Sequence, residues 1–288
     1  MADSQLPPVS VLTTAFNAEP FIAAAVRSVL AQRGVQVEHV VVDDGSEDRT
    51  VEVARGLDDP RVRIVEAGRV GRGRALNLAL EAASHDFVAI LDADDVAHPD
   101  RLAVEVRALA ARADLAAVGS GQLLLKGDIE PAFEPIDDAP EVRDVGGELL
   151  YYNPLSHSSV LFRRAALERV GGYDERRRAL FDWDLYIRLV SVGYQLAKLR
   201  SPLVGKRTHP RQYFEGRRMV RYALECLSLQ WAALGRLRRT RLNAPLLFAL
   251  FLYRLVPRVF RLGVRGAVGG RARRRSDEPD QTHADQSP

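Results

Sequence analysis

Hydrophobic and polar positions along the first half of the chain alternate between two periods. Short runs rich in β-branched residues predict strands at Val9–Thr13, Glu38–Val42, Arg61–Glu66 and Phe87–Leu91. Between and after them, apolar residues at helical spacing predict helices at 19–32, 48–55, 73–83 and 99–112. Strands that alternate with helices in this order predict an α/β fold, with a parallel sheet, right-handed crossovers and helices on both faces.

The pattern is less regular in the second half of the chain. It predicts, in order, a strand at 115–125, an acidic and proline-rich loop at 127–147, a strand at 158–163, and helices at 165–170 and 181–192. From Tyr222 onward the pattern is helical and increasingly basic. We therefore divide the chain into a sheet domain at 1–212, with halves at 1–115 and 116–212, a basic and partly amphipathic helical extension at 213–275, and a disordered tail at 276–288.

Composition sets the broad class of the protein. A chain of 288 residues, of which 47 % are hydrophobic, can bury a sizeable core. One cysteine, Cys226, excludes an internal disulfide, and residues 1–9 lack the basic and apolar stretches of a signal peptide. We therefore expect a globular protein in a reducing compartment, the cytoplasm.

Charge is distributed unevenly along the chain. Between Cys226 and Ser276 there are twelve arginines and no Asp, Glu or Lys, whereas the whole chain carries a net charge of only +3. Within this segment, Ala244–Tyr253 is a ten-residue apolar run, too short to span a bilayer, which needs about 20 residues. Four arginines that follow share one helical face: Arg254, Arg258, Arg261 and Arg265. We expect peripheral attachment to an anionic membrane surface; the alternative is a helical pair packed on the sheet domain with a solvated basic face.

Polar residues follow three of the predicted strands directly. Thr13-Thr14, Asp43-Asp44 and Asp92-Ala93-Asp94 each stand where a strand ends. In a parallel sheet all carboxyl ends meet at one edge, where ligands bind, so we expect these residues to converge on one cleft. The paired carboxylates of Asp92 and Asp94 suit Mg²⁺ or Mn²⁺, and Mg²⁺ commonly completes its shell with water and substrate phosphates. The alternative is an acidic turn that caps the helix after Pro99.

Two further turns carry candidate ligand-binding groups. A carboxylate of Asp43-Asp44-Gly45-Ser46 can accept hydrogen bonds from a nucleobase or ribose, or the turn can be a simple Asx turn before a helix. Gly71-Arg72-Gly73-Arg74 opens a helix, where backbone amides and two guanidinium groups can hold an anion, or where the arginines can simply be solvated.

Four motifs in order resemble those of a known family. VSVLTTAFNAEPFIAAAVRSVLAQ, HVVVDDGSEDRT, GRALNLAL and FVAILDADDVAHPDRL resemble the successive signatures of the family 2 glycosyltransferases, and the resemblance extends from residue 9 to about residue 210. It implies the GT-A fold, a Rossmann-like and mostly parallel sheet flanked by helices. It also implies an inverting, metal-dependent transfer of a sugar from a nucleotide-diphosphate donor to a glycan or glycolipid acceptor, in cell-surface polysaccharide synthesis, with Mn²⁺ or Mg²⁺ as cofactor.

The resemblance assigns roles to individual residues. In the half at 1–115, which would bind the nucleotide sugar, Thr14 and Phe16 would line the nucleotide pocket, Asp44 would meet the base, and Asp92 the base or ribose. Asp94 would bind the metal that bridges the diphosphate, and Arg74 would lie in the donor site. Asn77, in the ALN run, is assigned a structural role.

The half at 116–212 would bind the acceptor and supply the base. In Leu180-Phe181-Asp182-Trp183-Asp184, Asp182 falls on the family's base position, although Phe181 replaces the usual Glu. The alternative for Asp182 is a helix N-cap. His157 and Trp183 are candidates for acceptor binding and His209 for the diphosphate or metal, against structural roles for the histidines and a core position for Trp183.

Three rival classes remain to be weighed. Haloacid-dehalogenase-like phosphatases also use Asp-x-Asp, but on the first strand and followed by Thr or Val, whereas here it follows the fourth strand and precedes Asp95-Val96. A dinucleotide-binding dehydrogenase would need a glycine-rich turn after the first strand, and residues 14–19 contain no glycine. A catalytically degenerate, membrane-associated scaffold is suggested only by Phe181. No nucleic-acid partner is expected.

Overall fold

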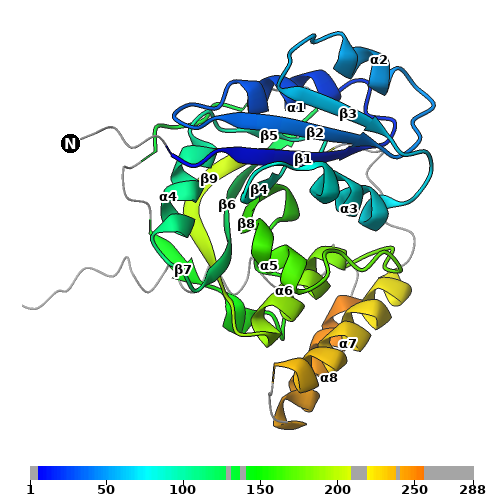
Figure 1. The fold of residues 1–288 in the computed structure, drawn as a ribbon. Coiled ribbons are helices and arrows are strands. Elements are labelled where there is room, and N and C mark those ends of the chain that lie inside the picture. Colours follow the sequence, from blue (N-terminus) through cyan, green and yellow to red (C-terminus); the bar gives the residue numbers. More distant parts are fainter. Residues whose placement is uncertain (1–5, 128–130, 137–140, 209–218, 238–240, 256–288) are drawn as a thin grey trace, which may run out of the picture.

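The computed structural model describes residues 6–127, 131–136, 141–208, 219–237 and 241–255, and within them one mixed sheet is flanked by helices (Figure 1). The strands are β1 (Val9–Ala15), β2 (Val37–Asp43), β3 (Val62–Glu66), β4 (Phe87–Ile90), β5 (Val96–Ala97), β6 (Leu115–Lys126), β7 (Val142–Asp144), β8 (Val160–Arg163) and β9 (Gln195–Thr208). They are ordered β3-β2-β1-β4-β8-β6-β9-β5, and β7 also pairs with β9. Strands β1 to β4 are parallel, as are β6 and β9, whereas β8 runs antiparallel to both of its neighbours. The predicted α/β class with a mostly parallel sheet is confirmed.

The helices occur where the periodicity predicts them, although α1, α2 and α4 start later than predicted. They are α1 (Ile22–Leu30), α2 (Thr50–Arg55), α3 (Arg72–Ala82), α4 (Arg101–Ala110), α5 (Arg164–Arg169), α6 (Phe181–Ser191), α7 (Met219–Arg236) and α8 (Ala244–Leu255). Helix α4 begins at Arg101 rather than at Pro99. The chain before it is held extended, because β5 pairs with β9 and the His98 N–H donates to the Leu203 carbonyl at 2.8 Å.

Three strands were not predicted from the sequence. Strand β9 carries Lys198, Pro202 and Lys206, which interrupt the alternation that reveals a strand. Strand β5 has only two residues, and β7 lies inside the predicted loop at 127–147. All three depend on pairing between distant segments, since β5 and β7 both pair with β9.

Both faces of the sheet are covered. Along β1, Val11 packs into one hydrophobic cluster with α1 and α4, while Leu12 packs into another with α3 and α6. Helices α7 and α8 join the second cluster through buried side chains that include Cys226, Leu229 and Leu247. The C-terminal helices, side by side in Figure 1, therefore share the core of the sheet domain.

The C-terminal helices differ in one respect from the predicted basic face. Arg254 points inward: its guanidinium donates to the side-chain oxygen of Gln230 at 2.7 Å and to the Tyr151 carbonyl at 3.0 Å. These acceptors hold Arg254 against the sheet domain, as in the alternative of a helical pair packed on that domain. Arg258, Arg261, Arg265 and the predicted tail lie outside the described residues. Among the described residues, no helix combines the length and hydrophobicity that crossing a bilayer requires.

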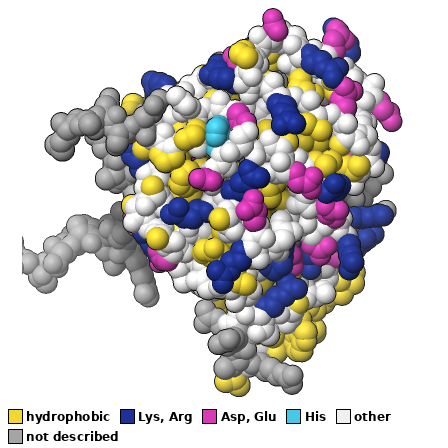
Figure 2. Space-filling model, in the orientation of Figure 1, with side chains coloured by type: hydrophobic (Ala, Val, Ile, Leu, Met, Phe, Trp, Pro, Cys, Tyr) yellow, Lys and Arg dark blue, Asp and Glu magenta, His cyan; other side chains and the backbone are white. Residues whose placement is uncertain are grey.

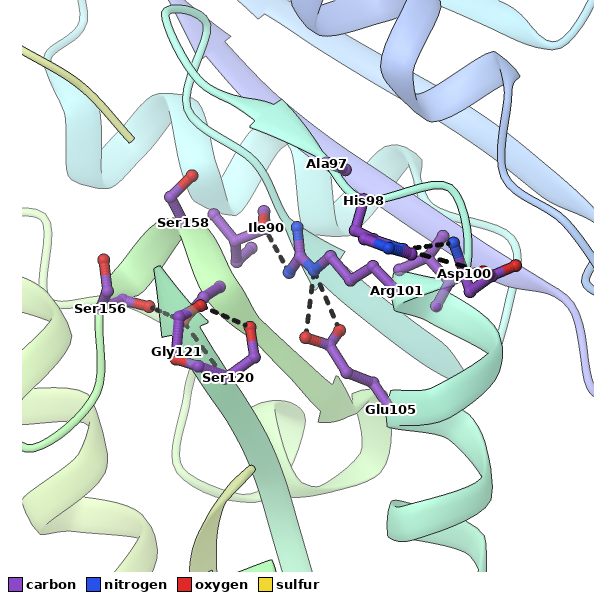
Figure 3. A network of polar contacts seen from close by, with 12 residues as sticks. Ile90, Ala97, His98, Asp100, Arg101, Glu105, Ser120, Gly121, Ser156 and Ser158 are labelled. Atoms are coloured by element: carbon purple, nitrogen blue, oxygen red, sulfur yellow. Dashed lines mark hydrogen bonds and ion pairs between the residues drawn. The ribbon is translucent and has the colours of Figure 1, made fainter. Parts of the chain in front are cut away.

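A buried ion pair anchors the end of β4 (Figure 3). Arg101 and Glu105 are both almost fully buried, and the Arg101 Nε donates to both carboxylate oxygens at 3.1 Å. Burial raises the pKa of Glu105 to about 7, against the opposing effect of Arg101. The guanidinium also donates to the Ile90 carbonyl at 3.0 Å, two residues before Asp92. Helix α4 is thus tied directly to the strand end that carries the carboxylate pair.

We predict that Arg101→Met lowers the free energy of unfolding by about 3–5 kcal/mol, because Glu105 would keep a buried carboxylate without its partner. The double variant Arg101→Met, Glu105→Met should recover most of this loss, since it removes both charges. Urea denaturation of the three proteins measures the difference. A double variant that is less stable than the single variant would contradict the prediction.

Candidate active site

A cavity of about 1130 Å³ opens at the carboxyl edge of the sheet. Its lining includes eight of the residues predicted for the site: Thr14, Phe16, Asp44, Asp92, Asp94, His157, Asp182 and Trp183. The predicted convergence of the strand ends is therefore present in the structure. Arg74 is not part of this lining, and His209 lies outside the described residues.

The turn after β2 uses its two carboxylates differently. Asp43 accepts hydrogen bonds from the backbone N–H groups of Gly45 and Ser46, so it forms the Asx turn that was the alternative for this motif. Asp44 lines the cavity, and one of its oxygens accepts from the N–H groups of Val70 and Gly71 at 2.7 and 2.8 Å. Asp44 thereby holds the loop that leads into α3 against the cavity.

The carboxylates after β4 form a compact cluster. Oxygens of Asp92, Asp94 and Asp95 lie within 4.8 Å of one another. Burial and the charges of Asp92 and Asp94 raise the pKa of Asp95 to about 8. One Asp95 oxygen accepts from the Arg207 N–H at 3.0 Å, and the other is buried without a hydrogen-bond partner among the described residues. This set of hard oxygen ligands, with an unsatisfied buried oxygen, fits a divalent cation such as Mg²⁺ or Mn²⁺.

Arg72 supplies positive charge to this cluster. Its guanidinium forms an ion pair with Asp92 and lies 5.1 Å from the centre of the Phe181 ring. Burial would raise the pKa of Asp92, but the positive charges of Arg72 and Lys206 outweigh it and the pKa is lowered. Arg72 therefore keeps Asp92 ionised in a partly buried position.

Arg74 lies on a different side of α3 from Arg72. Two residues correspond to a rotation of about 200° around a helix. Arg74 accordingly forms ion pairs with Glu81 and Glu175, at 3.0 and 3.2 Å, away from the cavity lining. The cavity lining therefore includes Arg72 but not Arg74, the arginine of this motif that was predicted for the donor site.

Asp182 lies in the first turn of α6, facing the cavity. The preceding Leu180 has a left-handed backbone conformation with φ of 57°, and it occupies the N-cap position that was the alternative for Asp182. One Asp182 oxygen accepts from the Asn153 side chain and the other from the Trp183 N–H, both at 2.8 Å. Burial raises the pKa of this carboxyl above its usual value, which favours proton acceptance.

The next carboxylate on α6, Asp184, is committed to structure. It is buried and forms ion pairs with Arg188 at 2.8 Å, Arg236 at 3.0 Å and Arg177 at 3.3 Å. These three arginines come from α6, α7 and the loop before α6. Asp184 thus joins three segments, and it is not part of the cavity lining.

His157 and Trp183 line the cavity but are largely buried. The indole N–H of Trp183 donates to the Leu149 carbonyl at 2.8 Å, which agrees with the core position weighed for it. The His157 Nε2 is 2.9 Å from the Tyr173 hydroxyl. Burial, with a smaller effect of Arg72, lowers the pKa of His157 to about 3, so its ring is neutral at physiological pH.

Several residues of the lining were not predicted from the sequence: Arg69, Asn153, Lys198, Lys206, Tyr222 and Arg254. The Arg69 guanidinium lies 3.3 Å above the centre of the Phe16 ring. Tyr222 and Arg254 belong to α7 and α8, which the sequence placed in a separate extension. Among these residues, only Asn153 stands in a recognisable sequence feature that could have indicated a position at the cavity, the Asn-Pro turn before Leu155.

Comparisons with known proteins identify relatives. The profile of the family described as Glycosyl transferase family 2 matches residues 10–122. The succinoglycan biosynthesis protein ExoO of Rhizobium meliloti (strain 1021) is 42 % identical over 116 residues, which cover 40 % of this chain and 32 % of ExoO. EpsE of Bacillus subtilis (strain 168), named as a glycosyltransferase, is 26 % identical over 238 residues, covering 81 % of this chain and 84 % of EpsE. The chain thus spans about a third of ExoO and most of EpsE.

Solved glycosyltransferase structures share the fold. The mannosyltransferase PcManGT from Pyrobaculum calidifontis, in complex with GDP-Man and Mn²⁺, superposes with a TM-score of 0.64 at 22 % identity, over 96 % of this chain and 78 % of its own. TarS 1-349 of S. aureus, in complex with UDP-GlcNAc, has a TM-score of 0.64 at 18 % identity, over 86 % of this chain and 72 % of its own. Residues 10–122 therefore match the Glycosyl transferase family 2 profile, and the chain shares the GT-A fold of these solved structures.

Proposed function

We propose that the protein transfers a sugar from a nucleoside-diphosphate donor to a hydroxyl of a glycan or glycolipid acceptor, with inversion, in the synthesis of a cell-surface polysaccharide. The observation that carries the proposal is the convergence of Asp44, Asp92, Asp94 and Asp182 on one cavity. Its volume of about 1130 Å³ exceeds that of most single-ligand pockets, which supports the binding of donor and acceptor together. The name of ExoO, a succinoglycan biosynthesis protein, supports a role in polysaccharide synthesis.

Donor binding is assigned to the strand-end residues. Thr14, Phe16 and Asp44 would hold the nucleoside, while Asp94, with Asp92 and Asp95 beside it, would hold Mn²⁺ or Mg²⁺. When bound, the cation neutralises charge that develops on the departing diphosphate. Arg72 balances Asp92 in the protein, and Lys206 adds a second positive charge at the same end of the cavity.

Asp182 is assigned the role of general base. Its carboxylate would accept the proton of the acceptor hydroxyl as the oxygen attacks the anomeric carbon, and a single displacement of this kind inverts that centre. Asn153 orients the carboxylate through its 2.8 Å hydrogen bond. The raised pKa brings the base closer to physiological pH, where its proton affinity is most useful.

The two alternative functions, a phosphatase and a catalytically degenerate scaffold, have less support. The Asp-x-Asp pair follows β4 in the middle of the sheet, whereas a haloacid-dehalogenase-like phosphatase requires it on the first strand. A degenerate scaffold would retain the fold without turnover. Its only hint, Phe181, contacts Arg72 in the structure and leaves Asp182 in the cavity lining.

We predict that Asp94→Ala abolishes metal-dependent binding of a nucleoside diphosphate, because the cation loses a carboxylate ligand. Isothermal titration with UDP and GDP, with and without Mn²⁺, measures the effect. Asp86→Ala, which removes an exposed carboxylate outside the cavity, is the matched control and should bind normally. Full Mn²⁺-dependent binding by Asp94→Ala would refute the assignment.

We predict that Asp182→Asn retains donor binding but loses transfer by on the order of 10²-fold or more, because the amide cannot accept the proton. Turnover of the unaltered protein should fall as the pH drops through the raised pKa of Asp182, since protonation disables the base. Steady-state rates with a panel of nucleotide sugars and acceptors test both points. Wild-type turnover by the variant would assign the base to another group.

We also propose that the protein attaches peripherally to the cytoplasmic membrane face. Large hydrophobic side chains are exposed on both C-terminal helices: Val220, Leu224 and Trp231 on α7, and Leu246, Phe248 and Leu252 on α8. Figure 2 shows hydrophobic side chains at the lower end of the molecule, where these helices lie in Figure 1. An apolar face beside a segment rich in arginine suits the boundary of an anionic leaflet.

We predict that Trp231→Ser, Phe248→Ser weakens co-sedimentation with anionic vesicles, because less apolar surface enters the headgroup region. Binding of the unaltered protein should require anionic lipid and weaken with salt. Leu124→Ser, which removes an equally exposed hydrophobic side chain from β6, should bind as before. Equal binding to neutral vesicles would rule out the electrostatic part of the proposal.

A further inference from the structure

A second pocket, of about 300 Å³, lies between the loop before α6 and the first turns of α7. We call it the arginine pocket, because its lining contains Arg176, Arg177, Arg178 and Arg221, with Glu225 as the one acidic residue. Figure 2 shows several basic side chains at the right-hand edge of the molecule, near the start of α7. None of the roles assigned above involves this pocket.

The arginine pocket keeps positive charge after its internal ion pairs are counted. Glu225 pairs with Arg221 at 2.9 Å. Arg177 pairs with Asp174 at 3.7 Å and shares Asp184 with two other arginines, so Asp184 is already more than neutralised. The side chains of Arg176 and Arg178 are exposed, and the structure gives neither of them an ion pair with a described residue.

One atom of the pocket has an unmet hydrogen-bonding requirement. The Nε of Arg177 is buried and lies 3.7 Å from a carboxylate oxygen of Asp174, too far for a hydrogen bond, and it donates none to any described residue. A buried donor without an acceptor is costly, and an oxyanion in the pocket would satisfy it. Planar guanidinium groups favour carboxylate and phosphate groups, which they bind with two parallel hydrogen bonds.

The arginine pocket adjoins the acceptor side of the cavity. Ala179 and Arg221 line the pocket, while their chain neighbours Leu180 and Tyr222 line the cavity. The arginine pocket and the cavity therefore lie on either side of the contact between α7 and the loop before α6. Leu180 stands two residues before Asp182, so the arginine pocket lies next to the part of the cavity that contains the proposed base.

Positive charge continues inside the cavity on this side. Lys198 donates to the Pro154 carbonyl at 3.0 Å, and Arg254 donates to Gln230 and to the Tyr151 carbonyl. These hydrogen-bond partners are neutral, so both cations place positive charge where the acceptor would bind. The nearby carboxylate, Asp182, has to remain available as the base.

We propose that the acceptor is an acidic glycan and that the arginine pocket is a subsite for one of its carboxylate groups. The inference rests on the proposed function, because it treats the Asp182 side of the cavity as the acceptor site. Lys198 and Arg254 receive the sugar nearest the reaction, and the arginine pocket binds an acidic substituent farther along the same chain. A phosphate group has the same recognition chemistry, and the experiment separates the two sources.

The test compares the unaltered protein with Arg176→Gln, Arg178→Gln. The probes are a hexuronic acid oligosaccharide and a neutral hexose oligosaccharide of the same length, titrated by calorimetry at low and moderate salt. The unaltered protein should prefer the acidic probe by on the order of tenfold, and the double variant should lose most of that preference. Arg27→Gln, which removes an exposed arginine from α1, is the matched control and should leave the preference unchanged.

Three outcomes would overturn the proposal. Equal binding of the acidic and neutral probes would remove its basis, and an equal loss in Arg27→Gln would show that only net charge matters. If the double variant loses binding to vesicles that contain a lipid diphosphate but binds the acidic oligosaccharide normally, the pocket recognises a lipid phosphate and the glycan assignment is wrong.

Donor hydrolysis separates this proposal from the proposed function. It needs no acceptor, so the double variant should hydrolyse a donor nucleotide sugar at the rate of the unaltered protein. Absence of hydrolysis and of nucleotide binding in every protein would contradict the proposed function, whereas unaltered hydrolysis with no preference for the acidic probe would contradict only the acceptor subsite.

Discussion

Mutual repulsion among the carboxylates at the end of β4 is the constraint that shapes the site. Carboxylate oxygens of Asp92, Asp94 and Asp95 lie within 4.8 Å of one another. Burial adds to the free-energy cost of keeping these carboxylates ionised. Groups from distant elements stabilise these carboxylates: Arg72 of α3 forms an ion pair with Asp92, and the backbone N–H of Arg207 in β9 donates a hydrogen bond to Asp95. The cluster therefore depends on contacts from both halves of the sheet.

The strand-end part of the site follows from local sequence. A short β-branched run predicts a parallel strand, and the topology of a parallel sheet places the last residues of such strands at its carboxyl edge. Thr14, Asp44 and Asp92 were placed correctly for this reason, although they are far apart in the chain. The placement of Asp182 depended instead on family resemblance, because it lies at a helix start rather than at a strand end.

The parts that could not be predicted depend on orientation and on distant partners. The choice between Arg72 and Arg74 turns on where α3 begins, and a shift of one residue rotates a side chain by about 100°. Strand β9 is recognisable only beside β6, since its own residues include a proline and several cations. Arg254 belongs to a run of arginines, and only the buried Gln230 and the Tyr151 carbonyl select it for an inward position.

The junction around Asp184 has a consequence for how such proteins can be recombined. Asp184 joins α6, α7 and the loop before α6, while Gln230 of α7 donates to the Leu150 and Tyr151 carbonyls. A chimaera that exchanged only the C-terminal helices would leave a buried carboxylate and two carbonyl groups facing foreign side chains. In a chimaera, residues 116–212 and the two C-terminal helices should therefore be exchanged together, with the junction before β6 rather than after β9.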